Sequence, residues 1–238
     1  MALSNKKIIS FKIFVLHSLK KIPGSLLFVF AFTFASAQPT RLSIATDLGL
    51  QRSFKKGQQY WAGGHTIQAQ FHFTSKDGAY VFISYYTNGK FSNNVTATAK
   101  SAVTVPRQIN YVNNAVMRFK QISVGWKKYM KGSSDIEEGW SIYGYAGFGL
   151  LLGRVDNSHS VPLDTVVYNV PVRKGKANFK RLTLDLGLGW ELPIGADTFI
   201  YAEGRAWIPT TDYPSKYIFV NDNAPLVGMV NVGIRILF

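Results

Sequence analysis

Apolar and polar residues alternate along much of this chain. In residues 181–192 every even position is Leu or Trp, and every odd position is charged, Thr or Gly. Because successive side chains of a β-strand point to opposite faces, this segment predicts a strand with one wholly apolar face. Gly187 and Gly189 lie on the other face and would be unusual on a solvated surface. The pattern favours a strand whose apolar face meets lipid and whose small and polar face, with Asp185 and Glu191, lines a crowded lumen.

Eight segments of this kind predict eight strands, each placed to within a few residues. They are 41–54, 64–74, 79–88, 115–131, 139–154, 179–193, 197–208 and 226–238. Most reach the roughly 9–11 residues that a tilted strand needs to cross the hydrocarbon of a membrane. The segments at 79–88 and 139–154 are apolar on both faces in part, which leaves their facing open.

The predicted connections alternate between short and long. The short ones are 74–78, 132–138 and 193–196, and the long ones are 55–63, 89–114, 155–178 and 209–225. This alternation is typical of an up-and-down barrel with both termini on the side of the short turns. Closure is also the way in which strands pair every backbone group in lipid. The predicted fold class is therefore all-β, a closed antiparallel transmembrane barrel of eight strands. A soluble secreted β-sandwich is the alternative, with the apolar faces packed in a core.

Aromatic residues give a second indication, because Trp and Tyr favour the interface between membrane and water. If the first strand runs outward, the even strands end at the periplasmic rim. The residues expected at this rim are Phe73, Trp126, Tyr129, Trp190 and Phe238. An outer girdle is less regular: Trp61, Trp207 and Tyr85 or Tyr86 are its candidates, with their facing open.

The first residues predict a secretory signal peptide. Residues 1–21 contain five lysines and no acid, residues 26–34 are almost wholly apolar, and Ala35-Ser36-Ala37 follows as a cleavage site. We therefore expect a signal peptide at 1–37 and a barrel domain at 38–238. A membrane anchor is the alternative, but the apolar run is shorter than the roughly 18 residues that indicate a spanning helix. The absence of Cys excludes a lipid-anchored lipoprotein.

The last segment carries a motif. In residues 230–238 the side chains of Asn231 and Gly233 fall on one face, and those of Ile236 and Phe238 fall on the other. The spacing resembles the C-terminal β-signal of bacterial outer-membrane barrels, polar-x-Gly-x-x-hydrophobic-x-aromatic. This resemblance implies recognition by the barrel-assembly machinery. Residues 40–238 together resemble the small eight-stranded outer-membrane barrels of Gram-negative bacteria, of the OmpA/OmpX type and the porin-like β-barrel domain family. That resemblance implies a location in the bacterial outer membrane.

Composition and charge narrow the possible functions. The chain has 238 residues and no Cys, which excludes a disulfide scaffold and a thiolate metal site. It carries 27 basic and 13 acidic residues, but the five early lysines belong to the predicted signal, so the remaining 201 residues have a net charge of +9. An exported chain without a helix-turn-helix or an RNP-like pattern is a poor candidate for nucleic-acid binding, and no nucleic-acid partner is expected.

The alternation predicts which side chains fill the lumen. The residues expected to point inward are Asp47, Gln68, Gln70, His72, Asp185, Glu191, Glu203, Arg205, Asn231 and Arg235. Charges in a narrow lumen need partners or water, because desolvation disfavours an isolated charge. We expect a network in which Arg205 and Arg235 meet Asp47, Asp185 or Glu203. A structural plug is favoured over a gate for this network.

The sequence indicates no catalytic or cofactor site. His65, His72 and His159 lack metal-ligand spacing. Ser158-His159-Ser160 stands near Asp156 in a predicted outer loop, but the spacing of the outer-membrane lipid deacylases is missing. We therefore expect a protein that is not an enzyme and binds no cofactor and no metal.

Basic residues gather in the predicted outer loops. Arg173, Lys174 and Lys176 form one such cluster. Clustered cations at a membrane surface attract anionic groups, so these three residues are candidate contacts for the phosphates of lipopolysaccharide. An ordinary solvated loop is an equally good interpretation. The expected partners are thus outer-membrane lipid, lipopolysaccharide and the assembly machinery.

Fold and pattern together favour a non-enzymatic surface barrel with a structural or surface-interaction role. A narrow porin-like channel for small solutes is the second hypothesis, and a lipid-modifying enzyme is a distant third.

Overall fold

The computed structural model describes residues 41–195, 197–210 and 225–238. The predicted signal peptide at 1–37 and most of the predicted connection at 209–225 lie outside these residues. The strands are β1 (Arg41–Ser53), β2 (Trp61–His72), β3 (Asp77–Ala99), β4 (Gln108–Lys131), β5 (Ser141–His159), β6 (Tyr168–Asn169), β7 (Gly175–Gly195), β8 (Thr198–Pro209) and β9 (Val227–Leu237). No helix in these residues is long and apolar enough to span a membrane.

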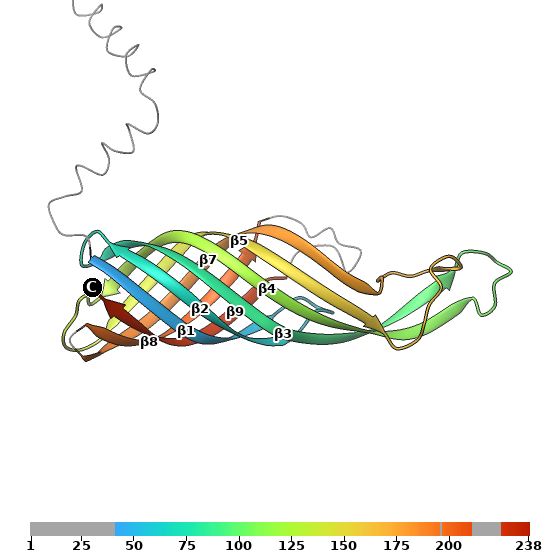
Figure 1. Cartoon of the computed structure of the whole chain (residues 1–238), viewed down its shortest axis with the longest axis horizontal. Helices are drawn as coiled ribbons and strands as arrows, with labels where there is room; N and C mark the ends of the chain where they lie inside the picture. The colour runs from blue at the N-terminus through green and yellow to red at the C-terminus, as the bar shows by residue number, and fades with distance from the viewer. Residues whose placement is uncertain (1–40, 196, 211–224) are drawn as a thin grey trace, which may run out of the picture. The chain divides into compact units, whose positions relative to one another are not determined.

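Eight of the strands form a closed ring. Each pairs antiparallel with its neighbours in the order β1, β2, β3, β4, β5, β7, β8, β9, and β9 pairs with β1. The two-residue strand β6 adds to the outer end of β3, outside the ring. Figure 1 shows the tilted strands, with the start of β1 and the C-terminus at the same end of the barrel. The predicted fold class, an eight-stranded antiparallel barrel, agrees with this ring.

The largest differences from the predicted strands are in β3 and β4. β3 continues to Ala99 and β4 begins at Gln108, so most of the predicted loop at 89–114 is a paired hairpin. The loop was predicted because the polar residues 92–94 interrupt the apolar alternation. Beyond a membrane neither face of a hairpin needs to be apolar, and the backbone ladder continues without that signal. A bulge between Tyr86 and Gly89, where Asn88 has a φ of 61°, lies where the hairpin leaves the ring.

Other strands reach further outward for the same reason. β5 ends at His159 rather than 154, and β7 begins at Gly175 rather than 179. The wall formed by β3, β4, β5 and β7 is therefore taller than the wall formed by β1, β2, β8 and β9. In Figure 1 the hairpin of β3 and β4 projects from the end of the barrel opposite the C-terminus.

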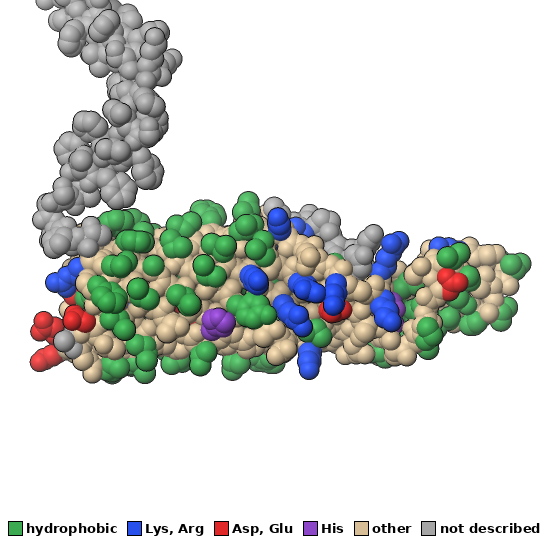
Figure 2. All heavy atoms as spheres, in the orientation of Figure 1, with side chains coloured by type: hydrophobic (Ala, Val, Ile, Leu, Met, Phe, Trp, Pro, Cys, Tyr) green, Lys and Arg blue, Asp and Glu red, His purple; other side chains and the backbone are tan. Residues whose placement is uncertain are grey.

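The burial pattern is inverted with respect to a soluble β-sandwich. Along β9 the outward residues Val230, Val232, Ile234 and Ile236 are exposed, while Asn231 and Arg235 are fully buried. The same alternation runs along β1 and β7. Figure 2 shows hydrophobic side chains spread over the visible side of the half of the barrel that holds the C-terminus, with charged side chains at the very end. An apolar exterior with a polar interior is the arrangement of a membrane-spanning barrel and excludes the sandwich.

Pairing across the strands arranges these outward side chains in rows. Val81, Val124, Phe148 and Leu184 are successive cross-strand partners on β3, β4, β5 and β7. Two residues further along each strand, the next row is Ile83, Ile122, Leu150 and Leu182. We call the outward apolar side chains of all eight strands the apolar band.

The periplasmic girdle is only partly as predicted. Phe73 and Trp126 are exposed and stacked, with ring centroids 5.3 Å apart, and Trp190 and Phe238 are also exposed. Tyr129 is wrong as a girdle residue: it is buried in the lumen beside the ring of Tyr143. Tyr129 is three residues after Trp126 on β4, and successive side chains of a strand point to opposite faces, so Tyr129 points inward where Trp126 points outward.

At the outer end the two tryptophans separate. Trp61 is exposed and lies under the guanidinium of Arg52, whereas Trp207 is buried in the lumen beside Tyr86. Of the two tryptophans, Trp61 is therefore the one available to an outer girdle, and of the two tyrosine candidates Tyr85 faces outward whereas Tyr86 is buried.

Candidate functional site

All ten side chains predicted to point inward are buried in the lumen. Strands β1, β2, β7, β8 and β9 supply them, because the same alternation that exposes the apolar band turns every second residue inward. The lumen is the first candidate site, since it contains the buried charges of the described residues. These charges form two clusters of ion pairs, and one further carboxylate is hydrogen-bonded to neutral side chains.

The first cluster centres on Arg205 of β8. Its Nη2 donates to Asp47 Oδ2 at 3.1 Å and to the carboxylate of Glu203, and its Nη1 donates to Thr66 Oγ1 at 3.1 Å. Tyr201 donates its hydroxyl to the same Asp47 oxygen at 3.0 Å. The sequence predicted that Arg205 meets Asp47 and Glu203, and the geometry places these three groups together. A single guanidinium with two carboxylates leaves this cluster with a formal charge of −1.

The second cluster centres on Arg235 of β9. Its Nε and Nη2 donate to the two carboxylate oxygens of Glu191, at 3.2 and 2.8 Å. Lys127 Nζ lies 3.7 Å from Glu191 Oε2 and donates to Gln70 Oε1 at 3.0 Å. This bidentate geometry is the strong form of an arginine–carboxylate contact. Two cations and one carboxylate give this cluster a formal charge of +1.

The predicted partner of Arg235 was wrong. It was expected to meet Asp47, Asp185 or Glu203, and it meets Glu191 instead. β9 and β7 flank β8 in the ring, and both Arg235 and Glu191 lie near the end of the barrel where the short turns are. Asp47, Asp185 and Glu203 lie nearer the outer end of the barrel. The prediction considered which strands are neighbours but not how far along the barrel axis each side chain lies.

Asp185 has no arginine partner within ion-pair distance. Gln121 Nε2 donates to its two oxygens at 3.2 and 3.3 Å, and Thr183 Oγ1 donates at 2.8 Å. Amide and hydroxyl donors thus satisfy this buried carboxylate. The expectation that it takes part in an ion pair was wrong, and neutral donors from β4 and β7 replace the cation.

A turn covers the lumen next to the second cluster. Ser134, in the connection between β4 and β5, is buried and accepts a hydrogen bond at its carbonyl from Arg235 Nη2 at 2.7 Å. Its amide donates to Ser75 O, in the turn between β2 and β3, also at 2.7 Å. The two short turns are therefore tied to each other and to the ion cluster below them.

Glycine and tyrosine pair across β5 and β7. Gly189 is opposite Tyr143 and Gly187 is opposite Tyr145, and in each pair the ring lies directly over the glycine. A Cβ on either glycine would overlap the ring, so the absence of a side chain is what allows the tyrosines to lie across the lumen. Tyr143 donates its hydroxyl to Glu203 Oε2 at 3.0 Å. Gly187 and Gly189, which the sequence placed on the polar face, are thus the positions over which the rings of the lumen tyrosines pack.

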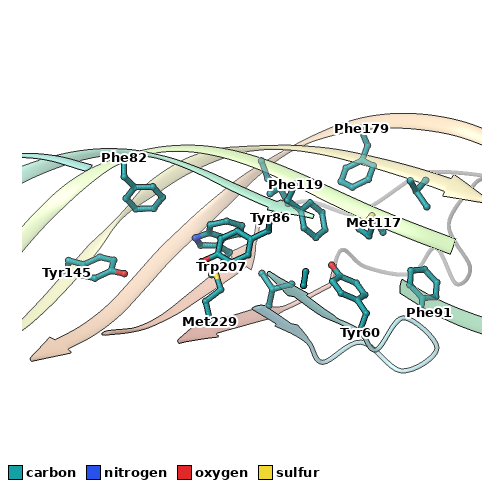
Figure 3. Close-up of a cluster of buried hydrophobic side chains, with 14 of the residues drawn as sticks. Tyr60, Phe82, Tyr86, Phe91, Met117, Phe119, Tyr145, Phe179, Trp207 and Met229 are labelled. Carbon is teal, nitrogen blue, oxygen red and sulfur yellow. The ribbon is translucent and has the colours of Figure 1, made fainter. Parts of the chain in front are cut away.

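Toward the outer end, aromatic rings and methionines occupy much of the interior, beside buried amides such as Gln51 and Asn113. Figure 3 shows Tyr60, Phe91, Phe119, Phe179 and Met117 pointing toward one another between the strands. Tyr60 and Phe91 stack with their centroids 5.9 Å apart. Packed rings and charges together fill the lumen at the levels that these residues occupy.

The C-terminal motif divides between the two faces of β9. Asn231 accepts a hydrogen bond from the Tyr86 hydroxyl at 2.9 Å, and Gly233 lies against the ring of Tyr201, where a Cβ would overlap it. Ile236 and Phe238 are exposed on the apolar band. The inward half of the motif serves packing, whereas the outward half leaves an apolar surface.

The residues considered for catalysis do not come together. Ser158 is exposed on the outer face and donates to Asn114 O at 3.3 Å, whereas His159 lies against the ring of Tyr111 on the opposite face. Burial there lowers the pKa of the imidazole from its usual value. Asp156 lies 3.9 Å from Lys176 Nζ. In the part of the chain that the structure describes, no group of three His, Asp or Glu side chains is arranged to hold a metal.

The three loop cations lie at the base of the outer loops. Arg173 and Lys174 are exposed just before β7, and Lys176 is exposed within it. Among the residues that sequence reasoning did not single out, Lys127 is the most deeply placed cation, with 2 % of its side chain exposed. The alternation Ile122-x-Val124-x-Trp126 on the outer face already implied that Gln121, Ser123 and Lys127 point inward.

Comparison with known proteins gives the fold. No protein-family model matches the chain, and no curated protein matches it in sequence. Neisserial surface protein A is 12% identical, with 83% of this chain and 97% of that chain covered, at a TM-score of 0.52. The attachment invasion locus protein Ail of Yersinia pestis, solved with the heparin analogue sucrose octasulfate, is 11% identical, with 84% and 100% covered, at 0.47. The β-barrel domain of Pseudomonas aeruginosa OprF is 10% identical, with 84% and 100% covered, at 0.45.

These neighbours are small outer-membrane β-barrel proteins. The likeness to Neisserial surface protein A concerns the fold alone, and it agrees with the eight-stranded antiparallel barrel that the sequence predicted.

Proposed function

We propose that this protein is an integral barrel of the bacterial outer membrane that is not an enzyme, and that it supports the envelope and presents its outer hairpin to the surroundings. The observation that carries this proposal is the combination of an apolar exterior with a lumen filled by paired charges and rings. A packed lumen favours a structural plug over a route for solutes. The hairpin of β3 and β4 extends beyond the apolar band and supplies a surface for contacts.

Export and assembly belong to the same proposal. Residues 1–37 act as a cleaved signal peptide, and the barrel-assembly machinery recognises Asn231, Gly233, Ile236 and Phe238. The exposure of Ile236 and Phe238 supports this role, because they add little to the packing of the barrel and leave an apolar edge for another protein. The exposed loop cations Arg173, Lys174 and Lys176 contact anionic headgroups of the outer leaflet.

The first experiment tests the membrane barrel. The purified protein is run on a denaturing gel, with and without boiling, and its circular dichroism is recorded in detergent. We expect a β-rich spectrum and a mobility that changes on boiling, since a closed barrel resists the detergent at room temperature. A protein that stays soluble without detergent and shows no mobility change would contradict the proposal.

The second experiment separates a plug from a channel. The wild type and the variants Arg205→Met and Arg235→Met are reconstituted separately into planar bilayers. We expect no discrete conductance steps from any of the three, because the rings and the turn around Ser134 still fill the lumen. A rise in single-channel conductance in either variant would indicate a gate and favour the porin-like alternative. Lipid-modifying activity is tested by measuring the mass of lipid A from cells that co-express the protein. We expect this mass to be unchanged.

A further inference from the structure

Four cations gather on the outer face of the tall wall, directly above the apolar band. Arg118 and Lys120 lie on β4, Arg154 lies on β5 and Lys180 lies on β7, and all four side chains are exposed. Together with Tyr85 and Leu152 they line a surface groove of about 570 Å³, which we call the basic groove. Figure 2 shows Lys and Arg side chains gathered beside the apolar band on the visible face.

The strand register fixes the height of this groove. Tyr85, Lys120, Leu152 and Lys180 are successive cross-strand partners, and Arg118, Arg154 and Asn178 form the next row outward. The row directly below Lys120 and Lys180 is the apolar row that includes Ile122 and Leu182. Neighbouring rows on one face are two residues apart, which is about 7 Å along the strand. The cations therefore begin within one row of the surface that meets hydrocarbon.

Among the residues that the structure describes, the cations of the basic groove have no acidic partner. In the described residues no carboxylate lies within ion-pair distance of Arg118, Lys120, Arg154 or Lys180. The nearest outward acid in the register is Asp156, two residues beyond Arg154, and it is paired with Lys176. Lys120 lies 6.0 Å above the Tyr85 ring. Four uncompensated cations side by side repel one another unless an anion lies between them.

We propose that the basic groove binds the headgroup of a diphosphorylated glycolipid of the outer leaflet, with its acyl chains along the apolar rows below. The location at the boundary of the apolar band favours a lipid over a soluble anion, because the headgroup of a lipid would contact the cations while its acyl chains contact the apolar rows below. Four cations on three strands suit two phosphate groups better than the single phosphate of a glycerophospholipid. The Tyr85 and Leu152 side chains lie at the level where sugar meets chain. This inference rests on the proposed function and adds a lipid-binding site on β4, β5 and β7 that is separate from the loop cations Arg173, Lys174 and Lys176.

Native mass spectrometry of the detergent-purified full chain tests the proposal. The probes are diphosphoryl lipid A, monophosphoryl lipid A with the same chains, and phosphatidylglycerol. The variant Arg118→Gln/Arg154→Gln removes two groove cations, and Arg118→Lys/Arg154→Lys keeps their charge. Lys100→Gln/Arg107→Gln is the matched control, because it removes two exposed cations from the projecting hairpin.

We expect the wild type to prefer diphosphoryl lipid A, and we expect the Gln variant to bind it roughly thirtyfold more weakly, at about fivefold for each cation near a membrane surface. The Lys variant and the hairpin control should retain most of the binding. Equal binding of the diphosphoryl and monophosphoryl lipids, or equal losses in the Gln variant and the control, would overturn the proposal. The boiled and unboiled gel of each variant separates this failure from a failure of the barrel itself, since the mobility change does not depend on the groove.

Discussion

At the scale of single residues, the charged side chains in the lumen are buried next to side chains of opposite charge. Arg205 pairs with Asp47 and Glu203, and Arg235 and Lys127 both pair with Glu191. A buried ion pair is not by itself a large source of stability, because desolvation offsets much of the attraction. Removing one partner is different, since it leaves a buried charge without compensation. The consequences of substitution should therefore depend strongly on which groups remain.

The variant Arg205→Met tests this dependence. It leaves Asp47 and Glu203 buried and adjacent, so we expect the free energy of unfolding to fall by about 3–5 kcal/mol. Urea unfolding in lipid vesicles, followed by tryptophan fluorescence, measures the change. The control is Lys176→Met, which breaks an exposed pair with Asp156 and should cost less than about 1 kcal/mol. Adding Asp47→Asn and Glu203→Gln to the Arg205 variant should restore much of the loss, and no restoration would contradict the explanation.

The glycines that lie under the lumen tyrosines give a second test at this scale. In Gly189→Ala the new methyl group would overlap the Tyr143 ring, so the ring must move and its hydrogen bond to Glu203 is lost. We expect a destabilisation of about 1–3 kcal/mol, in the range of overpacked cores. Gly63→Ala is the control, because a Cβ at Gly63 meets nothing within 4 Å. In the same unfolding assay, the effect of Gly189→Ala should shrink when Tyr143 is already Ala, and strict additivity would count against a direct overlap.

At the scale of elements, the sequence was most informative where lipid imposes a pattern. Strands β1, β8 and β9 were placed to within one residue at both ends, since each has an apolar face that must be continuous across the membrane. The outer halves of β3 and β4 were missed because polar residues at 92–94 and 113–114 interrupt the apolar alternation, although one face of the hairpin buries Val95, Ala97 and Tyr111. Facing was readable from alternation, which is why the ten lumen residues were found.

Partners within the lumen were harder to predict than facing. Alternation gives the direction of a side chain but not its height, and heights depend on the register between strands that are far apart in the sequence. Arg235 was assigned to the wrong acid for that reason. The basic groove was missed because its cations come from β4, β5 and β7, and only the pairing of Lys120 with Leu152, and of Leu152 with Lys180, brings them together.

The last strand supplies a prediction about assembly. Phe238 follows β9 and is 68% exposed, although its amide donates to Leu42 O at 2.7 Å. Removing its ring in Phe238→Ala should change the stability of the folded barrel little, yet we expect several-fold less protein with heat-dependent mobility in cells. Refolding of the purified variant into lipid vesicles should match the wild type. Equal losses in cells and in vitro would indicate a packing role rather than recognition by the assembly machinery.

At the scale of the whole molecule, the apolar band has a definite height. On β7 it runs from Leu182 to Leu192, a span that corresponds to roughly 33 Å along the strand. A strand tilt of about 40° reduces this span to roughly 25 Å across the membrane, which is the usual height of the apolar band in outer-membrane barrels. The basic groove begins directly above this height and the Phe73–Trp126 pair lies at the other end, so both limits of the band are marked by side chains suited to an interface.

This height predicts how the barrel responds to bilayer thickness. A band of roughly 25 Å is shorter than a typical hydrocarbon core of about 30 Å, so a thick bilayer must thin around the protein, at a cost that rises with each ångström of mismatch. We therefore expect the purified protein to refold with higher yield in vesicles of short-chain lipids than in vesicles of long-chain lipids of the same headgroup. Gel mobility without boiling measures the yield. Substituting Leu182 and Ile122 by Ser would lower the band by one row on the tall wall, and the optimum should then shift to still thinner bilayers. An optimum that does not move would mean that the rows next to the basic groove do not meet hydrocarbon, and the lipid-binding proposal would lose its geometric basis as well.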